Sequence, residues 1–179
     1  MLSIDGERTP GPRIAFGQSE LVRENAITSS SAMIRRDLLE TYGAFDPDRG
    51  LWGSIDYELW LRLLPHTEFA YVPEPLVLYR VHERQMSAQR VRMDEGALLE
   101  LEKTRAANQE LAAEFSRSIG ILRCVLRRRG RGRRELLDAI RRNPRDTLAW
   151  SWLARATVGP DAVRRLGTAF GRQRAASSA

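Results

Sequence analysis

The chain has 179 residues, a formal net charge of +6, 42% hydrophobic residues and a single cysteine, Cys124. This length suits one ordinary domain or a small domain with an appendage, and the apolar fraction excludes a chain that is disordered throughout. One cysteine excludes an internal disulfide framework and a cysteine-based zinc site, so Cys124 is most simply a small filler of the core.

Charge is divided unevenly along the chain. Residues 1–116 contain 13 basic and 19 acidic residues, whereas residues 117–179 contain 16 arginines and four acidic residues. The basic C-terminal part is the one feature that indicates an extended anionic partner. The sequence shows neither a signal peptide nor about 18 consecutive apolar residues. We therefore expect a cytoplasmic protein, with association at the inner membrane face as an alternative.

The first half of the chain alternates between β-type and helical patterns. Residues 1–24 open with closely spaced Gly and Pro and predict irregular chain. The segment "NAITSSSAMI" (25–34) predicts a strand, and "RRDLLETYG" (35–43) predicts a helix that ends at Gly43. The loop "AFDPDRGLWG" (44–53) follows, with turn residues and two glycines.

A second helix is predicted directly after this loop. Ser54 is a suitable N-cap residue, apolar side chains then recur at helical spacing, and Pro65 stops the helix. The recurring residues are Tyr57, Trp60, Leu61 and Leu64. The segment "EFAYVPEPLVLYRVH" (68–82) predicts two short strands on either side of a proline-rich corner.

Only helices are predicted in the rest of the chain. One long helix is expected from Met93 to Ile119, followed by helices at 133–142, 146–158 and 160–170. The fold class is thus predicted to be α/β, with few strands in residues 25–90 and a basic helical tail in residues 91–179. Two or three strands make a poor independent sheet, so the first part is expected to be a portion of something larger.

The ordered set "RRDLLETYGAFD", "DYELWLRL", "FAYVPEPLVLYRVH" and "QMS" resembles the second half of the catalytic domain of family 2 glycosyltransferases. The resemblance covers about residues 25–87, a third of the chain. It implies a partial GT-A fold, the nucleotide-diphospho-sugar transferase type, of which this chain holds the acceptor side. The N-terminal nucleotide-binding half is absent from the sequence. The chain is therefore expected to be a truncated gene product, a product of a mis-set start codon, or one part of a split enzyme.

The resemblance implies an inverting transfer of sugar from a nucleotide-sugar to an acceptor hydroxyl, with a carboxylate as general base. The base lies in a Glu-Asp pair, which corresponds here to Ile55 and Asp56. Ile55 replaces the acidic partner, so Asp56 alone is the candidate base. The alternative is structural, because an Asp in the first turn of a helix also complements the helix dipole.

The resemblance also assigns residues to the substrates and to a metal. Arg80 and His82 share one face of the predicted strand and become candidates for contacts with the diphosphate, with His82 also a candidate metal ligand. The alternative for His82 is a surface histidine at the end of a strand. Trp52, in the loop before Asp56, is a candidate for sugar stacking. The family implies Mn²⁺ or Mg²⁺, whose main ligands are absent from this chain. The Asp-x-Asp spelling at 46–48 lies downstream of the expected place and is not taken as the metal site.

Two functions of different class therefore remain open. The chain is a glycosyltransferase part that is inactive alone, acting on a nucleotide-sugar and a glycan or lipid-linked acceptor with an N-terminal partner half. Alternatively, it is a non-catalytic sugar- or partner-binding module with a basic helical tail, so enzyme status is uncertain. For the tail, "RCVLRRRGRGRRELL" suits phosphates, and the resemblance implies an anionic membrane surface because many enzymes of that family act on lipid-linked acceptors. This segment has no aromatic residue to stack on bases, which argues against nucleic acid. The favoured alternative is a basic face that is simply solvated.

Overall fold

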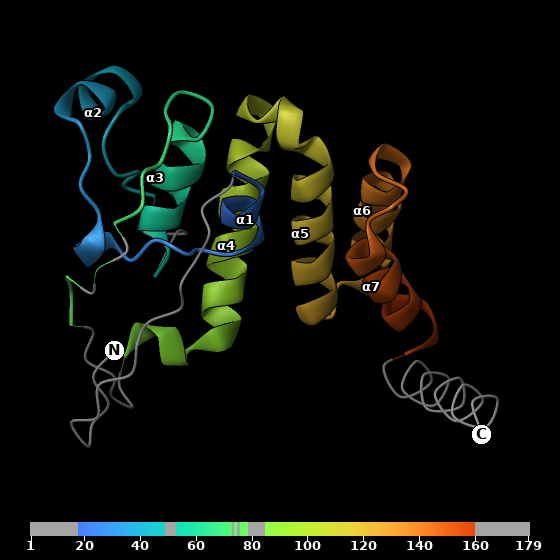
Figure 1. Cartoon of the computed structure of the whole chain (residues 1–179). Coiled ribbons are helices and arrows are strands. Elements are labelled where there is room, and N and C mark those ends of the chain that lie inside the picture. Colours follow the sequence, from blue (N-terminus) through green and yellow to red (C-terminus); the bar gives the residue numbers. More distant parts are fainter. Residues whose placement is uncertain (1–17, 49–52, 73, 75, 79–84, 160–179) are drawn as a thin grey trace, which may run out of the picture. The chain divides into compact units, whose positions relative to one another are not determined.

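The computed structural model describes residues 18–48, 53–72, 74, 76–78 and 85–159, and the chain divides into unit 1, Met1–Phe115, and unit 2, Ser116–Ala179. Within these described ranges every regular element is helical (Figure 1). The α-helices are α1 (Gln18–Arg23), α2 (Arg36–Tyr42), α3 (Ile55–Leu63), α4 (Arg90–Thr104), α5 (Ala112–Val125), α6 (Arg129–Arg142) and α7 (Thr147–Val158). Short 3₁₀ turns are η1 (Ser29–Ser31), η3 (Met86–Ala88), η4 (Arg105–Ala107) and η5 (Gln109–Leu111).

The predicted α/β fold, a partial GT-A fragment, is wrong for the described residues, which form helices and no sheet. The segment 25–34 does have extended backbone, with ψ angles of 125° at Thr28 and 143° at Ala32, but it is interrupted by η1. An extended segment becomes a strand only when a neighbour accepts and donates its ladder hydrogen bonds. No such neighbour lies beside this segment in the part of unit 1 that the structure describes.

Helix α3 forms the centre of unit 1. The predicted apolar face is confirmed, because Tyr57, Trp60, Leu61 and Leu64 are all buried, and α3 ends at Leu63, two residues before Pro65. Burial extends beyond that face to Glu58, Leu59 and Leu63, so the helix is covered on most sides. Helices α1, α2 and α4 pack against it.

Two elements of unit 1 differ from the sequence-based expectation. Helix α1 lies in the segment predicted to be irregular, and its Leu21 and Val22 are buried. The long helix predicted from Met93 to Ile119 is divided into α4 and α5 by two 3₁₀ turns. Asn108 lies at this break, where its side-chain amide donates to the carbonyls of Thr104 at 2.9 Å and Leu61 at 3.1 Å. The buried amide therefore caps the end of α4 and ties it to α3.

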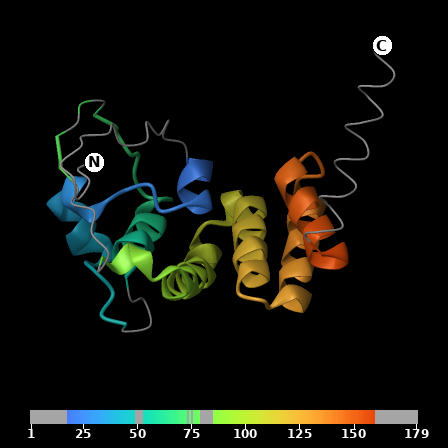
Figure 2. The same cartoon turned by 90° about the horizontal axis from the view of Figure 1, so that it is seen from below.

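In unit 2, the second half of α5 is followed by a helical hairpin of α6 and α7 (Figures 1 and 2). Leu136, Ala139, Ile140 and Ala149 form its core, against which Cys124 packs as predicted. The hairpin turns at Asn143-Pro144, also as predicted, and Asp146 caps α7 by accepting from the amide of Ala149 at 3.0 Å. The helix predicted at 160–170 lies outside the described residues.

Helices α5 and α6 approach closely at two glycines. A Cβ added at Gly132 would lie 2.5 Å from Cys124 Sγ and 2.9 Å from the carbonyl oxygen of Gly120. Real Cβ atoms do not come this close, so both positions require a residue without a side chain for the observed crossing.

Candidate functional site

Asp56 lies half-buried in the first turn of α3, where the sequence predicted it. Its Oδ1 accepts hydrogen bonds from Asn25 Nδ2 at 3.1 Å and from its neighbour, the Tyr57 amide, at 2.8 Å. Its Oδ2 accepts from the Ser29 hydroxyl at 2.6 Å. The carboxylate therefore has one fixed orientation, with two of its three donors contributed by the extended segment that precedes α2.

An ionised carboxylate offers about four acceptor positions on its two oxygens. The described residues fill three of them at Asp56, and they leave capacity for one further donor on Oδ2. A hydroxyl could donate there. The same arrangement also ties the segment 25–29 to the start of α3, so the geometry suits both a proton acceptor and a structural anchor.

The segment before α2 is attached to α3 by two further side chains. The Tyr57 hydroxyl donates to the carbonyls of Leu21 at 2.8 Å and Val22 at 3.1 Å, and its burial raises the pKa of Tyr57 far above the usual range. Trp60 Nε1 donates to the Ile27 carbonyl at 3.3 Å. Trp60 is thus a core residue, as the sequence favoured.

Two buried polar side chains, Ser54 and Glu100, lie near the start of α3, and no pattern in the sequence indicates that they meet. Glu100 of α4 is fully buried, and neither of its carboxylate oxygens has a hydrogen-bond partner in the described part of the chain. Ser54 occupies the predicted N-cap position, but its hydroxyl is buried and caps nothing. Both side chains leave polar atoms unsatisfied.

Burial raises the pKa of Glu100 to about 9. The Ser54 hydroxyl lies near enough to lower this pKa, although no bond of ordinary geometry joins the two, and the carboxylates of Asp56 and Glu58 raise it. Glu100 is therefore a neutral acid at pH 7. The sequence offers little indication that Glu100 is buried, because a single Glu in a predicted helix is normally a surface residue.

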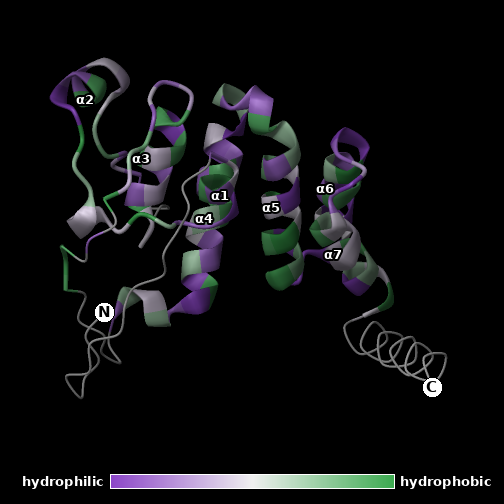
Figure 3. Ribbon diagram, viewed as in Figure 1, coloured by the Kyte–Doolittle hydropathy of each residue, from purple (hydrophilic) through white to green (hydrophobic). Residues whose placement is uncertain are grey.

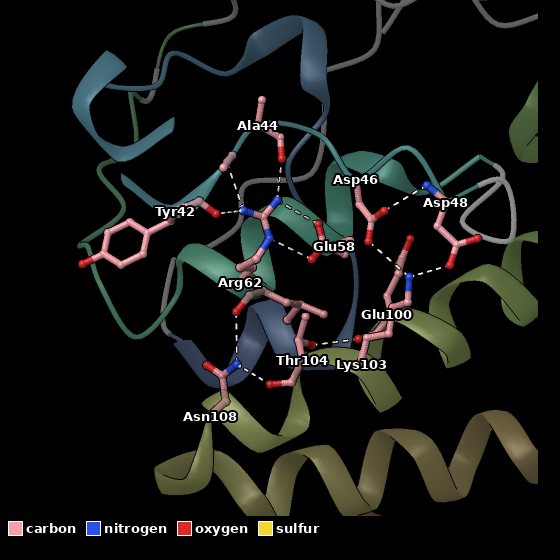
Figure 4. A network of polar contacts seen from close by, with 12 residues as sticks. Tyr42, Ala44, Asp46, Asp48, Glu58, Arg62, Glu100, Lys103, Thr104 and Asn108 are labelled. Atoms are coloured by element: carbon pink, nitrogen blue, oxygen red, sulfur yellow. Dashed lines mark hydrogen bonds and ion pairs between the residues drawn. The ribbon is translucent and has the colours of Figure 1, made fainter. Parts of the chain in front are cut away.

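Arg62 organises the other end of α3 (Figure 4). Its guanidinium binds the carboxylate of Glu58 at 2.9 Å and 3.1 Å, and it also donates to the carbonyls of Tyr42, the last residue of α2, and of Gly43 and Ala44, which follow α2. Arg62 therefore both pairs with Glu58 within α3 and braces the loop that follows α2. Nearby, His66 stacks on the ring of Tyr42, with the two centroids 4.0 Å apart.

The Asp-x-Asp motif at residues 46–48 does not form a metal site. Lys103 of α4 donates from Nζ to Asp46 at 3.1 Å and to Asp48 at 2.5 Å, and the Asp48 amide also donates to Asp46 (Figure 4). The Asp48 amide and then the ammonium group lower the pKa of Asp46, and the two aspartates in turn raise the pKa of Lys103. A lysine thus occupies the position that a cation would need.

Across the described ranges, no group of three or more His, Cys, Asp or Glu side chains could hold a metal ion. The residues that are described therefore do not fit the Mn²⁺ or Mg²⁺ implied by the resemblance. Trp52, Arg80 and His82, the other predicted site residues, lie outside the described residues and stay predictions.

Two further findings concern membrane-spanning helices and similarity to known proteins. No helix in the described part of the chain combines the length and the apolar character needed to cross a membrane. Comparison of the chain with models of protein families, with curated proteins and with solved structures found no match, so the likeness to family 2 glycosyltransferases rests on the quoted motifs alone.

Proposed function

We propose that this chain contributes the acceptor side of an inverting, family 2-like glycosyltransferase, with Asp56 as its general base. The observation that supports this role is the fixed carboxylate at the start of α3, which keeps one acceptor position on Oδ2 among the described residues. A base must be held within hydrogen-bond reach of the proton that it removes, and its orientation must not change during the reaction.

In this proposal the acceptor hydroxyl donates to Asp56 Oδ2. As its oxygen forms a bond to the anomeric carbon, its proton passes to the carboxylate. The bond from that carbon to the diphosphate breaks on the opposite face, and the nucleotide diphosphate leaves with the electron pair. Because attack and departure occur on opposite faces, the anomeric configuration is inverted.

The donor has to be bound by groups other than the described residues. Those residues hold no cluster suited to a divalent cation, and Lys103 already neutralises Asp46 and Asp48. We therefore propose that a second polypeptide part binds the nucleotide-sugar. The chain alone should release no nucleotide from UDP-, GDP- or dTDP-sugars, because the described residues hold no cation site that would stabilise the leaving diphosphate in the transition state.

The second candidate function is a non-catalytic sugar- or partner-binding module. It is favoured by the same carboxylate, because all three of its donors come from the protein itself and two of them fix the backbone of residues 25–29. In this reading Asp56 is an anchor for the segment before α2. Its substitution would then change stability and leave any transfer reaction unaffected.

The deciding experiment measures turnover and melting temperature on the same preparations. The chain is co-expressed with the polypeptide encoded directly upstream of the Met1 codon in the same frame, and nucleotide release is followed. Asp56→Asn should lower turnover by about 10²–10⁴-fold, since a general base contributes about this much, with donor affinity little changed.

Asp37→Asn is the matched control. Asp37 also lies in the first turn of a helix and binds a nearby side chain, Arg35, but it is exposed and far from Asp56 in sequence. Its substitution should leave turnover intact. Full turnover in Asp56→Asn, or no transfer in any assembly with the upstream polypeptide, would favour the binding module.

A further inference from the structure

Unit 2 carries many more arginines than it can neutralise. Residues 116–159 contain twelve arginines and three acidic residues, Glu135, Asp138 and Asp146. Each of these acids already binds an arginine, with N–O distances of 2.8–2.9 Å. The arginines used are Arg117 for Asp146, Arg123 for Glu135 and Arg142 for Asp138.

The remaining arginines are concentrated at one place. Six lie within eight residues, all of them exposed, and none forms an ion pair with another described residue. We call them the arginine cluster: Arg127, Arg128, Arg129, Arg131, Arg133 and Arg134. They surround the N-terminus of α6, where the helix dipole adds further positive potential. The chain therefore gathers like charges where they repel one another and the helix.

One member of the cluster also has an unfavourable backbone conformation. Arg127 has a φ of 60°, the one positive φ at a non-glycine residue in the described chain. A glycine would adopt this conformation without the steric cost that a Cβ brings. Neither the charge nor the backbone conformation of Arg127 thus stabilises the folded unit. This is expected of a residue whose role is to bind an external partner.

Apolar side chains accompany the cluster. Val125 ends α5 and is 46% exposed, and Val158 ends α7 and is 55% exposed. Because α6 and α7 are antiparallel, the end of α7 lies at the same end of the hairpin as the start of α6 (Figure 1). Figure 3 shows hydrophobic turns at the end of α5 followed directly by hydrophilic chain. This end of unit 2 therefore combines positive charge with small exposed apolar groups.

We propose that this end of unit 2 binds the surface of an anionic phospholipid bilayer. Guanidinium groups pair with phosphate and carboxylate headgroups, and the exposed valines enter the boundary between headgroups and acyl chains. The inference is independent of the function proposed for Asp56. A nucleic acid would also attract the arginines, but the described residues exposed at this end include no aromatic ring on which bases could stack.

The test uses the full chain and sedimentation with vesicles. Vesicles of phosphatidylcholine alone are compared with vesicles in which one third of the lipid is phosphatidylserine. Binding is expected to the anionic vesicles only, and it should fall when NaCl rises from about 0.1 M to about 1 M, because the Debye length shortens from about 10 Å to about 3 Å. Equal binding to both vesicles, or no binding at low salt, would overturn the proposal.

Two variants with equal loss of charge locate the surface. Replacing Arg128, Arg131 and Arg134 by Gln should lower partition into anionic vesicles by about 100-fold, since each arginine near the surface contributes about fivefold. The control replaces three exposed arginines of unit 1, Arg23, Arg36 and Arg90, by Gln and should bind like the unaltered chain. Equal losses in both variants would mean that only net charge matters and would refute a specific docking end.

Arg127→Gly separates binding from stability. It removes one charge and relieves the positive φ, so it should weaken vesicle binding about fivefold while the melting temperature stays the same or rises. A variant that merely unfolds would lose both. Tighter binding of the chain to duplex DNA or RNA than to anionic vesicles at the same salt would replace the lipid by a nucleic acid and overturn the proposal.

Discussion

Unit 1 and unit 2 are both helical, but the polar contacts that hold them differ in reach. In unit 1, Tyr57 binds a carbonyl 36 residues away, Trp60 one 33 residues away, and Lys103 an aspartate 57 residues away. In unit 2, the corresponding contacts join residues 12 to 29 apart and connect α5 to α6 or to the N-cap residue of α7. Unit 1 therefore depends on side chains that fix irregular segments, whereas unit 2 depends on close packing of adjacent helices.

The comparison shows that two helical units can lose stability through different kinds of substitution. In unit 1 the irregular segment before α2 is held to α3 by a few side-chain hydrogen bonds, so the loss of any one of them should matter. In unit 2 a single polar contact is supported by the apolar core of the hairpin, so its loss should matter less, and steric fit should matter more. The following substitutions compare matched positions in the two units.

The largest difference is expected between two ion pairs with the same i,i+4 spacing. Arg62 in unit 1 binds Glu58, whose side chain is 5% exposed, whereas Arg142 in unit 2 binds Asp138, whose side chain is 33% exposed. Arg62→Ala should lower the free energy of unfolding by about 3 kcal/mol, because it leaves a buried carboxylate unpaired. Arg142→Ala should cost less than about 1 kcal/mol, as for a surface pair. Urea unfolding of both variants measures this, and equal losses would contradict the comparison.

Steric fit in unit 2 is tested at two glycines of α6. Gly132→Ala places a Cβ against Cys124 and Gly120 and should cost about 2 kcal/mol, since overpacking a close helix crossing forces the helices apart. Gly130→Ala meets no atom within 4 Å and should instead stabilise the helix by up to about 1 kcal/mol. Thermal unfolding followed by circular dichroism distinguishes the two. Stabilisation by both alanines would show that the gain in helix propensity outweighs any steric cost at the crossing, and it would contradict this account.

The buried acid of unit 1 predicts a dependence of stability on pH. The folded pKa of Glu100 is raised to about 9, above its ordinary value near 4.5, so its contribution is fully present below pH 4.5 and is lost as pH rises toward 9. The loss is at most about 1.4 kcal/mol for each pH unit in that window. Glu100→Gln keeps the shape and cannot ionise, so the variant should become progressively more stable than the parent from pH 5 to pH 8. Parallel stability curves for the two proteins would contradict a raised pKa.

The smallest expected effect compares two N-cap positions. Asp146 in unit 2 accepts from the Ala149 amide, so Asp146→Asn should keep the cap, while Asp146→Ala should cost about 1 kcal/mol more. Ser54 in unit 1 caps nothing, and Ser54→Ala removes a buried hydroxyl without a partner. Its effect should be close to zero or stabilising. A cost of about 1 kcal/mol for Ser54→Ala, measured by urea unfolding, would show that the hydroxyl does satisfy the helix start.

Local signals predicted most of the helices. Pro65, Asn143-Pro144 and Gly159 mark the ends of helices because they act through the backbone of their immediate neighbours. The strands were predicted from an apolar β-type pattern, and this pattern says nothing about whether a partner strand lies alongside. The break at Asn108 was missed for a similar reason, because its amide bonds to Leu61, which no local pattern brings near.

The candidate site was predictable only in its central residue. Asp56 could be identified from its place before the aromatic helix, but its partners Asn25 and Ser29 lie 31 and 27 residues earlier. The raised pKa of Glu100 could not be predicted from the sequence, because it results from burial and not from the residue type. The surroundings of Asp56 and Glu100 both depend on contacts between distant segments. Local patterns in a single sequence do not predict such contacts.

The clamp between Lys103 and the two aspartates has a consequence for the order of folding. Its contacts close a loop of 55 to 57 residues, and closing such a loop requires most of the intervening chain of unit 1 to be in place. The hairpin of unit 2 needs only neighbouring helices to meet, and folding rates fall as contacting residues become more distant in sequence. After dilution from denaturant, unit 2 should therefore regain its helices first, and the Lys103 clamp should form among the last contacts of unit 1.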